Sequence, residues 1–189
     1  AVTHVILKEF YVEHQVPFFL EYLTQYTDSP FLVELEAEGT VYRSGRFVRA
    51  DRIGRYQDAE RGDWKFLVYD RRSGTPRMPK GSVGFRWQSQ PGQWNLKMED
   101  GLDDTPLDPA LTFLGQHDAV VQVTFCEFGG GTSVSRSVPV KYLVTHEGRI
   151  PVATVFDLLM AQFGVGRGLP GDYPERYEED RPYTPAWQE

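Results

Sequence analysis

Residues 119–164 read AVVQVTFCEFGGGTSVSRSVPVKYLVTHEGRIPVATVFDLLMAQFG. The β-branched and aromatic residues of AVVQVTF (119–125) and SVPVKYLVT (137–145) predict two strands, because such side chains fit a pleated backbone. The polar, glycine-containing HEGR (146–149) predicts the turn of a further hairpin. TVFDLLMAQFG (154–164) predicts an amphipathic helix that is capped by Thr154 and ended by Gly164. The stretch therefore indicates strands that lead directly into a helix, as in a mixed α/β fold.

The residues before position 31 predict two helices. Apolar residues near i, i+3, i+4 and i+8 indicate a first amphipathic helix that gives way near His14. Pro17 at a first-turn position predicts the start of a second helix, PFFLEYLTQY (17–26). Pro30 stops this helix, because a proline disfavours helical geometry at Ser29 before it. The apolar stripe of the first helix consists of Val2, Val5, Ile6 and Phe10.

The central part of the sequence predicts β-structure with a long irregular excursion. FLVELEAEGTVYRSGRFV (31–48) alternates apolar and polar residues on both sides of Glu38 and Gly39, which is typical of a hairpin with one solvated face. WKFLVYD (64–70) predicts a short strand that ends at the turn RRSG. Prolines and glycines then punctuate residues 74–109, a stretch too long for an ordinary connection. Brief strand candidates within or beside it are SVGFRW (82–87), QWNLKM (93–98) and PLDPALTFL (106–114).

Both ends of the sequence predict incomplete helices. RPYTPAWQE (181–189) places Thr184 at an N-cap and Pro185 after it, yet one turn of helix is too short to be stable. Residues 1–12 begin without a capping residue. A processed mature chain would account for the N-terminus alone, but two such ends favour a fragment of a longer protein. We therefore expect a helical segment that completes an α/β domain (1–30), β-rich hairpins with an irregular insertion (31–150), and a helix, a glycine-rich turn and the start of a truncated helix (151–189).

Charge, hydropathy and cysteine content argue against several classes of protein. Twenty basic against 27 acidic residues give a net charge of −7, which argues against a nucleic-acid partner. No apolar run approaches the ~18–20 residues that span a bilayer, so we expect no direct membrane insertion. The single cysteine, Cys126, excludes an internal disulfide and an iron–sulfur cluster ligated only by cysteines of this chain. Its strand-like surroundings predict a buried, unreactive thiol.

One basic run repeats with a spacing of three. This spacing would place several arginines along one face of a helix, with an acidic residue between them only at Asp51. We interpret the run as a solvated or interface face, and a phosphate-binding patch is the alternative. The run consists of Arg43, Arg46, Arg49, Arg52 and Arg55.

No set of residues has the spacing of a catalytic or metal site. His117 beside Asp118 could serve as a general base, but a solvated loop histidine is the simpler interpretation. FGGGTS (128–133) precedes a strand, so it lacks the helix N-terminus that binds phosphate, and VGRGLPG (165–171) is the exit turn of a helix. We therefore predict no catalytic, cofactor-binding or metal-binding residue in this chain. The four histidines, which do not recur at metal-ligand spacing, are His4, His14, His117 and His146.

Aromatic residues gather in the irregular part of the sequence. Trp64, Trp87 and Trp94, with Phe85 among them, would suit the stacking face of a carbohydrate-binding module. Packing is the commoner use of such residues in a β-rich segment. A free-standing β-rich binding module remains one alternative for the function.

Several motifs together resemble a known family. HVILKEF, YTDSPFLVELE, GRFVRADRIG, GSVGFRW followed by GQWNL, PVKYL, PVATVFDLLMAQFGVGRGL and YTPAW occur in the order found in the catalytic α subunit of membrane-bound respiratory nitrate reductases. These enzymes belong to the dimethyl sulfoxide reductase superfamily of molybdenum oxidoreductases. The resemblance covers nearly the whole chain and departs mainly around residues 100–110 and 129–137, which look shorter than in that family.

The resemblance implies an interior segment of a larger enzyme that reduces nitrate to nitrite. It implies a mixed α/β fold, part of an α/β domain of a molybdopterin oxidoreductase with a β-rich irregular insertion. The parent enzyme would hold molybdenum bis(molybdopterin guanine dinucleotide) and a 4Fe-4S cluster, with ligands outside this chain, so the segment alone would be inactive and bind no cofactor.

The same resemblance implies partners and a location. The partners would be the remainder of the α subunit, an iron–sulfur β subunit and a membrane haem subunit, at the cytoplasmic face of the cell membrane as a peripheral part of the complex. A related molybdenum enzyme that acts on selenate, chlorate, perchlorate or a hydrocarbon is the closest alternative.

Overall fold

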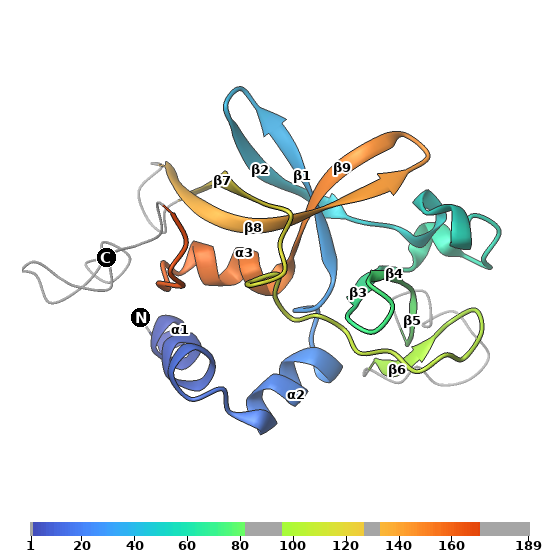
Figure 1. Cartoon of the computed structure of the whole chain (residues 1–189), viewed down its shortest axis with the longest axis horizontal. Coiled ribbons are helices and arrows are strands. Elements are labelled where there is room, and N and C mark those ends of the chain that lie inside the picture. Colours follow the sequence, from blue (N-terminus) through green and yellow to red (C-terminus); the bar gives the residue numbers. More distant parts are fainter. Residues whose placement is uncertain (1, 82–95, 127–132, 171–189) are drawn as a thin grey trace, which may run out of the picture.

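The computed structural model describes residues 2–81, 96–126 and 133–170, and it has a mixed α/β fold (Figure 1). The predicted helix start at 184, the glycine run at 129–131, SVGFRW and most of WNL lie outside these residues. The helices are α1 (Val2–Ile6), the π-helix η1 (Leu7–Glu13), α2 (Pro17–Tyr26), the short 3₁₀ helices η2 (Ala50–Arg52), η3 (Gly54–Tyr56) and η4 (Gly62–Trp64), and α3 (Val155–Gln162). The strands are β1 (Leu32–Glu38), β2 (Val41–Phe47), β3 (Val68–Asp70), β4 (Thr75–Arg77), β5 (Pro79–Lys80), β6 (Lys97–Asp100), β7 (Ala119–Cys126), β8 (Ser133–Thr145) and β9 (Gly148–Thr154).

Five strands form a closed barrel in the order β1-β2-β7-β8-β9. β8 is long enough to serve two neighbours: its first part pairs with β7, from Ala119↔Val140 to Cys126↔Ser133, and its second part pairs with β9. β1 pairs with β9 through Leu32↔Thr154, so the last strand lies beside the first. The ring closes through a short parallel ladder between β2 and β7, Tyr42↔Val123 and Arg43↔Thr124.

The predicted hairpins are confirmed. β1 and β2 meet at Gly39, whose φ of 65° is a backbone conformation that glycine adopts without strain. β8 and β9 meet at Thr145↔Gly148, as HEGR predicts. The strand predicted in WKFLVYD is confirmed only for its last three residues, which form β3, while Trp64 lies in η4. β3 pairs with β4 in a two-stranded hairpin, and Gly74 in its turn has a φ of 64°.

The α-helices lie on one side of the barrel, where α3 lies under β8, with α1 and α2 beyond it (Figure 1). One apolar cluster joins the barrel strands to Leu158 and Ala161 of α3. Another joins α3 to the first helices, where the rings of Tyr11 and Phe156 lie 4.8 Å apart at 71°. These contacts stabilise the N-terminal helices because each buried apolar side chain contributes about 1.5–3 kcal/mol.

Helix α2 begins at Pro17 and ends at Tyr26, as predicted, but the predicted face of the first helix is wrong. Val2 and Phe10 are exposed, whereas His4 and Leu7 are buried. The physical reason is the change from α-helix to π-helix at Leu7. Hydrogen bonds from residue i to i+5 widen the turn, so a spacing of 3.6 residues does not describe this segment.

The excursion between residues 74 and 109 is β-rich and irregular in its described part, with β5 and β6 forming a second two-stranded sheet. The expected strand in 106–114 is wrong. Only isolated bridges occur there, Glu99↔Pro106 and Asp70↔Pro109, because a proline has no N–H to donate to a ladder. The division of the chain at residues 30 and 150 stays a prediction.

Candidate functional site

The histidines of the described residues lie apart and do not form a site. His4 is buried, and its Nδ1 atom lies 2.8 Å from the carbonyl oxygen of Phe163. His14, His117 and His146 are exposed. Asp118, next to His117, accepts a hydrogen bond of 2.9 Å from the Tyr142 N–H, so its carboxylate supports the barrel.

No group of three or more histidine, cysteine, aspartate or glutamate residues that could hold a metal ion occurs within residues 2–81, 96–126 and 133–170. The thiol of Cys126 is exposed, so the prediction of a buried thiol is wrong. Its neighbour Phe125 takes the inward position, because side chains alternate between the two faces of a strand. With one cysteine in the whole sequence, this chain does not fit a four-cysteine iron–sulfur cluster.

The arginine run does not form a helical face. Arg43 and Arg46 lie on strand β2, Arg49 follows it, and Arg52 and Arg55 lie in two short 3₁₀ helices. Hydrogen bonding between β2 and β1 determines the backbone structure here, so the spacing of three between the arginines is a coincidence.

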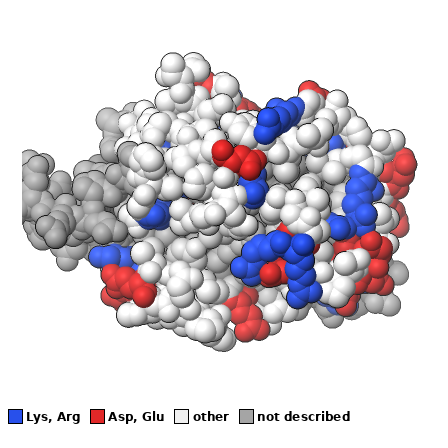
Figure 2. Space-filling model, in the orientation of Figure 1, with Lys and Arg blue, Asp and Glu red and all other residues white. Residues whose placement is uncertain are grey.

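Each of three arginines meets an acidic residue that is distant in sequence. Arg43 lies 2.8 Å from Glu36, and Arg55 pairs with Asp103. Arg52 lies 2.6 Å from both Glu34 and Glu147. Figure 2 shows several places on one face of the molecule where basic and acidic side chains lie next to one another. The exposed arginines of the run are consistent with the predicted solvated face. Arg52, by contrast, links β1 to the β8–β9 turn.

Trp64 is about half exposed, in η4. The remaining residues of the aromatic hypothesis, Phe85, Trp87 and Trp94, lie outside the described residues. The stacking face therefore stays a hypothesis.

A fully buried polar group surrounds Asp157 on helix α3. Its carboxylate accepts hydrogen bonds from the Thr112 hydroxyl at 2.5 Å, the Phe113 N–H at 2.8 Å and the Thr154 hydroxyl at 3.0 Å. Thr154 caps the helix, as predicted, by accepting from the Asp157 N–H at 3.0 Å. Complete burial raises the pKa of Asp157 to about 6, against the lowering effect of these donors.

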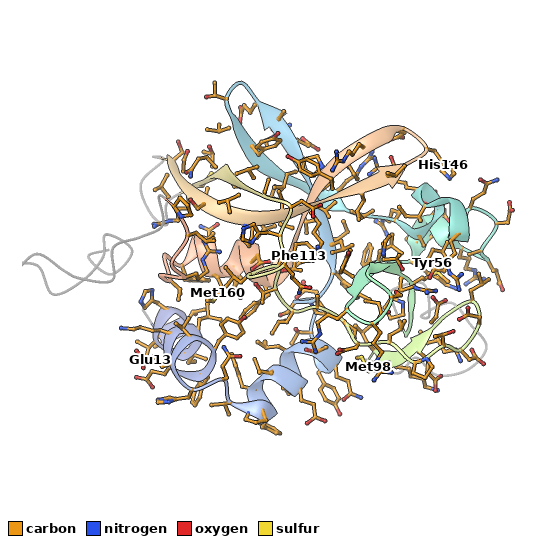
Figure 3. The ribbon with its side chains drawn as sticks, in the orientation of Figure 1. Glu13, Tyr56, Met98, Phe113, His146 and Met160 are labelled. Atoms are coloured by element: carbon orange, nitrogen blue, oxygen red, sulfur yellow. The ribbon has the colours of Figure 1, made fainter. Side chains whose placement is uncertain are left out.

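A partly buried arginine, Arg167, extends this group toward the turn after the helix. Arg167 donates to the Asp157 carbonyl oxygen at 3.2 Å and to the Ser137 carbonyl oxygen on β8. Arg136, also on β8, lies against Gly164, where a Cβ atom would come within 3.1 Å of its Nη1 atom. We call this group the Asp157 junction, and its residues are Thr112, Phe113, Thr154, Asp157 and Arg167. It joins the barrel to α3 and to the turn after α3. Figure 3 labels one of these residues, Phe113.

A second buried carboxylate, Asp100, anchors the irregular excursion. The Tyr56 hydroxyl donates to it, Arg77 donates at 3.2 Å, and the Leu102 N–H donates at 2.8 Å. Burial raises the pKa of Tyr56, and its hydrogen bond with Asp100 raises it further. Tyr56 and Asp100 come from segments 44 residues apart, so the bond fixes β6 against the 3₁₀ helices (Figure 3).

Both junctions were missed by sequence reasoning, and only the first had a local signal. T-V-F-D (154–157) matches the capping pattern of a hydroxyl residue followed three positions later by an acid. Nothing near Asp100 in the sequence points to Tyr56. Both carboxylates are enclosed by hydrogen-bond donors of the protein itself, and such buried, paired groups stabilise the surrounding structure.

None of the helices in the described part of the chain has the length and hydropathy needed to cross a bilayer. The class of protein that the fold and these junctions define is a mixed α/β scaffold with a small closed barrel.

Comparison with known proteins finds relatives that are much longer than this chain. The chain is 39% identical over 191 residues to the nitrate reductase alpha chain of Bacillus subtilis, and 40% identical over 196 residues to the nitrate reductase alpha subunit of Mycobacterium tuberculosis. It is 38% identical over 204 residues to the respiratory nitrate reductase 2 alpha chain of Escherichia coli. Each comparison covers all of this chain, which spans only 15–16% of the length of these relatives. No family model matches the chain. The chain is therefore related along its whole length to one segment of nitrate reductase alpha chains, which confirms the resemblance.

Proposed function

We propose that the chain is a structural segment of a molybdenum-dependent respiratory nitrate reductase alpha subunit, whose whole protein reduces nitrate to nitrite. The observation that carries the proposal is identity of 38–40% along the entire chain to alpha chains from three unrelated bacteria. Similarity that runs through strands, helices and loops alike supports a shared position in a shared fold.

The role of the segment is to hold a shape. The Asp157 and Asp100 junctions join elements that are distant in sequence, and both oxygens of each carboxylate accept hydrogen bonds from the protein. Satisfied buried networks specify one arrangement of the surrounding backbone. Such a rigid body positions its neighbours in the larger alpha subunit while contributing no reacting group of its own.

The cofactors belong to the whole protein in this proposal. These are molybdenum bis(molybdopterin guanine dinucleotide), which supplies oxygen-atom transfer when bound, and a 4Fe-4S cluster that delivers electrons. The single, exposed cysteine and the absence of a metal-holding group among the described residues support ligands elsewhere in the protein.

The complex would comprise the remainder of the alpha subunit, an iron–sulfur beta subunit and a membrane haem subunit. The alpha subunit would be peripheral, at the cytoplasmic face of the membrane. The two Escherichia coli relatives are named respiratory nitrate reductases, which supports a place in an electron-transport complex.

Purification of the whole protein from its source tests the proposed function. We expect molybdenum and iron in the purified protein, and nitrate consumption matched by nitrite formation with a reduced viologen as electron donor. Selenate, chlorate and perchlorate serve as competing substrates, because a preference for one of them would assign a related molybdenum enzyme. The isolated 189-residue polypeptide is expected to hold no molybdenum and to leave nitrate unchanged, and turnover by that polypeptide would contradict the structural role.

A further inference from the structure

Helix α2 carries an exposed row of aromatic rings, which we call the aromatic row: Phe18, Tyr22 and Tyr26. The three residues are spaced by four and are 76%, 50% and 51% exposed. Their rings lie against one another, with centroid distances of 6.4 Å between the first two and 5.5 Å between the last two. Residues four apart lie on one side of a helix, so the row is a continuous surface.

The opposite side of α2 is also apolar. Phe19, Leu20 and Leu23 pack against the cluster that contains Phe156 and Met160 of α3. Phe19 also contacts Phe10 of η1, with ring centroids 5.6 Å apart. A helix that is apolar on opposite sides is typically covered on both.

The charge and the exposed area of α2 indicate what kind of surface would cover the aromatic row. Residues 17–26 include one acidic residue, Glu21, and no lysine, arginine or histidine, so a covering surface with basic residues at its edge would be complementary. The exposed surface of these three aromatic side chains amounts to roughly 300 Å². A stable interface between separate molecules buries about 800 Å² per partner, so the row is too small to hold a second copy of this chain by itself. Segments of one polypeptide face no such requirement, because the chain already holds them together.

We propose that the aromatic row of α2 is the surface on which another part of the same alpha subunit docks, through an apolar patch edged by lysine or arginine. The proposal rests on the proposed function. The length of the relatives supports it: this chain spans 15% of their length, which leaves most of an alpha chain to supply the covering surface.

Site-specific photocrosslinking in the whole complex tests the proposal. A benzophenone amino acid replaces Tyr22 in the full-length alpha chain, the assembled complex is irradiated, and crosslinked peptides are identified by mass spectrometry. We expect peptides of the same alpha chain from outside these 189 residues, and their loss after denaturation in urea. The matched control places the same amino acid at Phe19 on the opposite side of α2, where crosslinks to η1 or α3 are expected.

Other crosslinking partners would overturn the proposal. A mixture of isotopically light and heavy alpha chains distinguishes crosslinks within one chain from crosslinks to a second copy. Peptides from a second copy, from another subunit or from residues 82–95 would each assign a different occupant, and no peptide at all would mean that the row faces water. Nitrate turnover is measured separately on the unmodified complex, so loss of the proposed function and loss of the docking surface give different results.

Discussion

The carboxyl group of Asp157 titrates in an unusual range because it is completely buried. Burial raises its pKa from 3.8 to about 6, so the folded chain binds a proton more tightly than the unfolded chain. Between these two values folding takes up a proton. The neutral carboxyl therefore contributes its full stabilisation below about pH 4. This contribution, about 3 kcal/mol for a pKa difference of this size, is lost as the pH rises through about 6.

The Asp157→Asn variant is expected to lose this part of the pH dependence. The amide has nearly the same shape and keeps one acceptor oxygen, but it does not ionise. Urea unfolding of the purified polypeptide at several pH values between 4 and 7 gives the free energy of unfolding of both proteins. Parallel pH profiles for the two proteins would show that Asp157 does not titrate in this range.

Gly164 ends helix α3 in a conformation that disfavours other residues. Its φ is 63°, and an added Cβ would lie 3.1 Å from Arg136 Nη1. We expect Gly164→Ala to reduce the free energy of unfolding by about 1–3 kcal/mol through backbone strain, and by more if Arg136 cannot move. Gly115→Ala is the matched control, because Gly115 has a φ of 74° with nothing within 4 Å of the added atom. Equal losses in thermal unfolding would exclude a contribution from Arg136.

At the scale of elements, strand β1, the β8–β9 turn and the 3₁₀ helix η2 are joined by one ion-pair network. Arg52, whose side chain is 11% exposed, lies 2.6 Å from Glu34 and from Glu147. Arg52→Met would leave Glu34, 16% exposed, without its nearest partner, at a cost of about 2 kcal/mol. Arg43→Met removes the exposed pair with Glu36 and should cost less than about 1 kcal/mol. Chemical denaturation compares the two variants, and a larger effect at Arg43 would refute this assignment.

Elements with a local chemical signal could be predicted from the sequence. Pro17 begins α2, glycines turn the hairpins at residues 39 and 148, and Thr154 caps α3. Spacing without such a signal was unreliable. The arginine run has a period close to that of a helix, but its first members lie on β2, where the neighbouring strand β1 supplies the hydrogen bonds.

Long-range contacts of the candidate junctions had no counterpart in the sequence. Tyr56 meets Asp100 across 44 residues, and Thr112 meets Asp157 across 45. Such pairs depend on how the elements pack in three dimensions, which local sequence patterns do not describe. Burial, which sets the titration of Asp157, is likewise a property of the packed chain.

At the scale of the whole molecule, the barrel has one weak closure. β2 and β7 are joined only at Tyr42↔Val123 and Arg43↔Thr124, whereas β7 and β8 pair along the whole of β7. We expect amide hydrogens between β2 and β7 to exchange faster than those between β7 and β8, because opening a short ladder disrupts less structure. Hydrogen exchange followed by NMR or mass spectrometry measures both, and equal protection would show that the ring opens as a unit.

Ring closure also limits how neighbouring polypeptide can attach to this body. Strands β1, β2, β7 and β9 of the barrel each have a partner on both sides over part of their length, and along these doubly paired parts an incoming chain finds no free row of backbone groups to lengthen the sheet. Attachment by β-augmentation is thereby disfavoured along the doubly paired parts of the barrel. Contacts with the rest of a large subunit would instead depend on the shape and chemistry of side chains, which can diverge between homologues while the backbone stays the same.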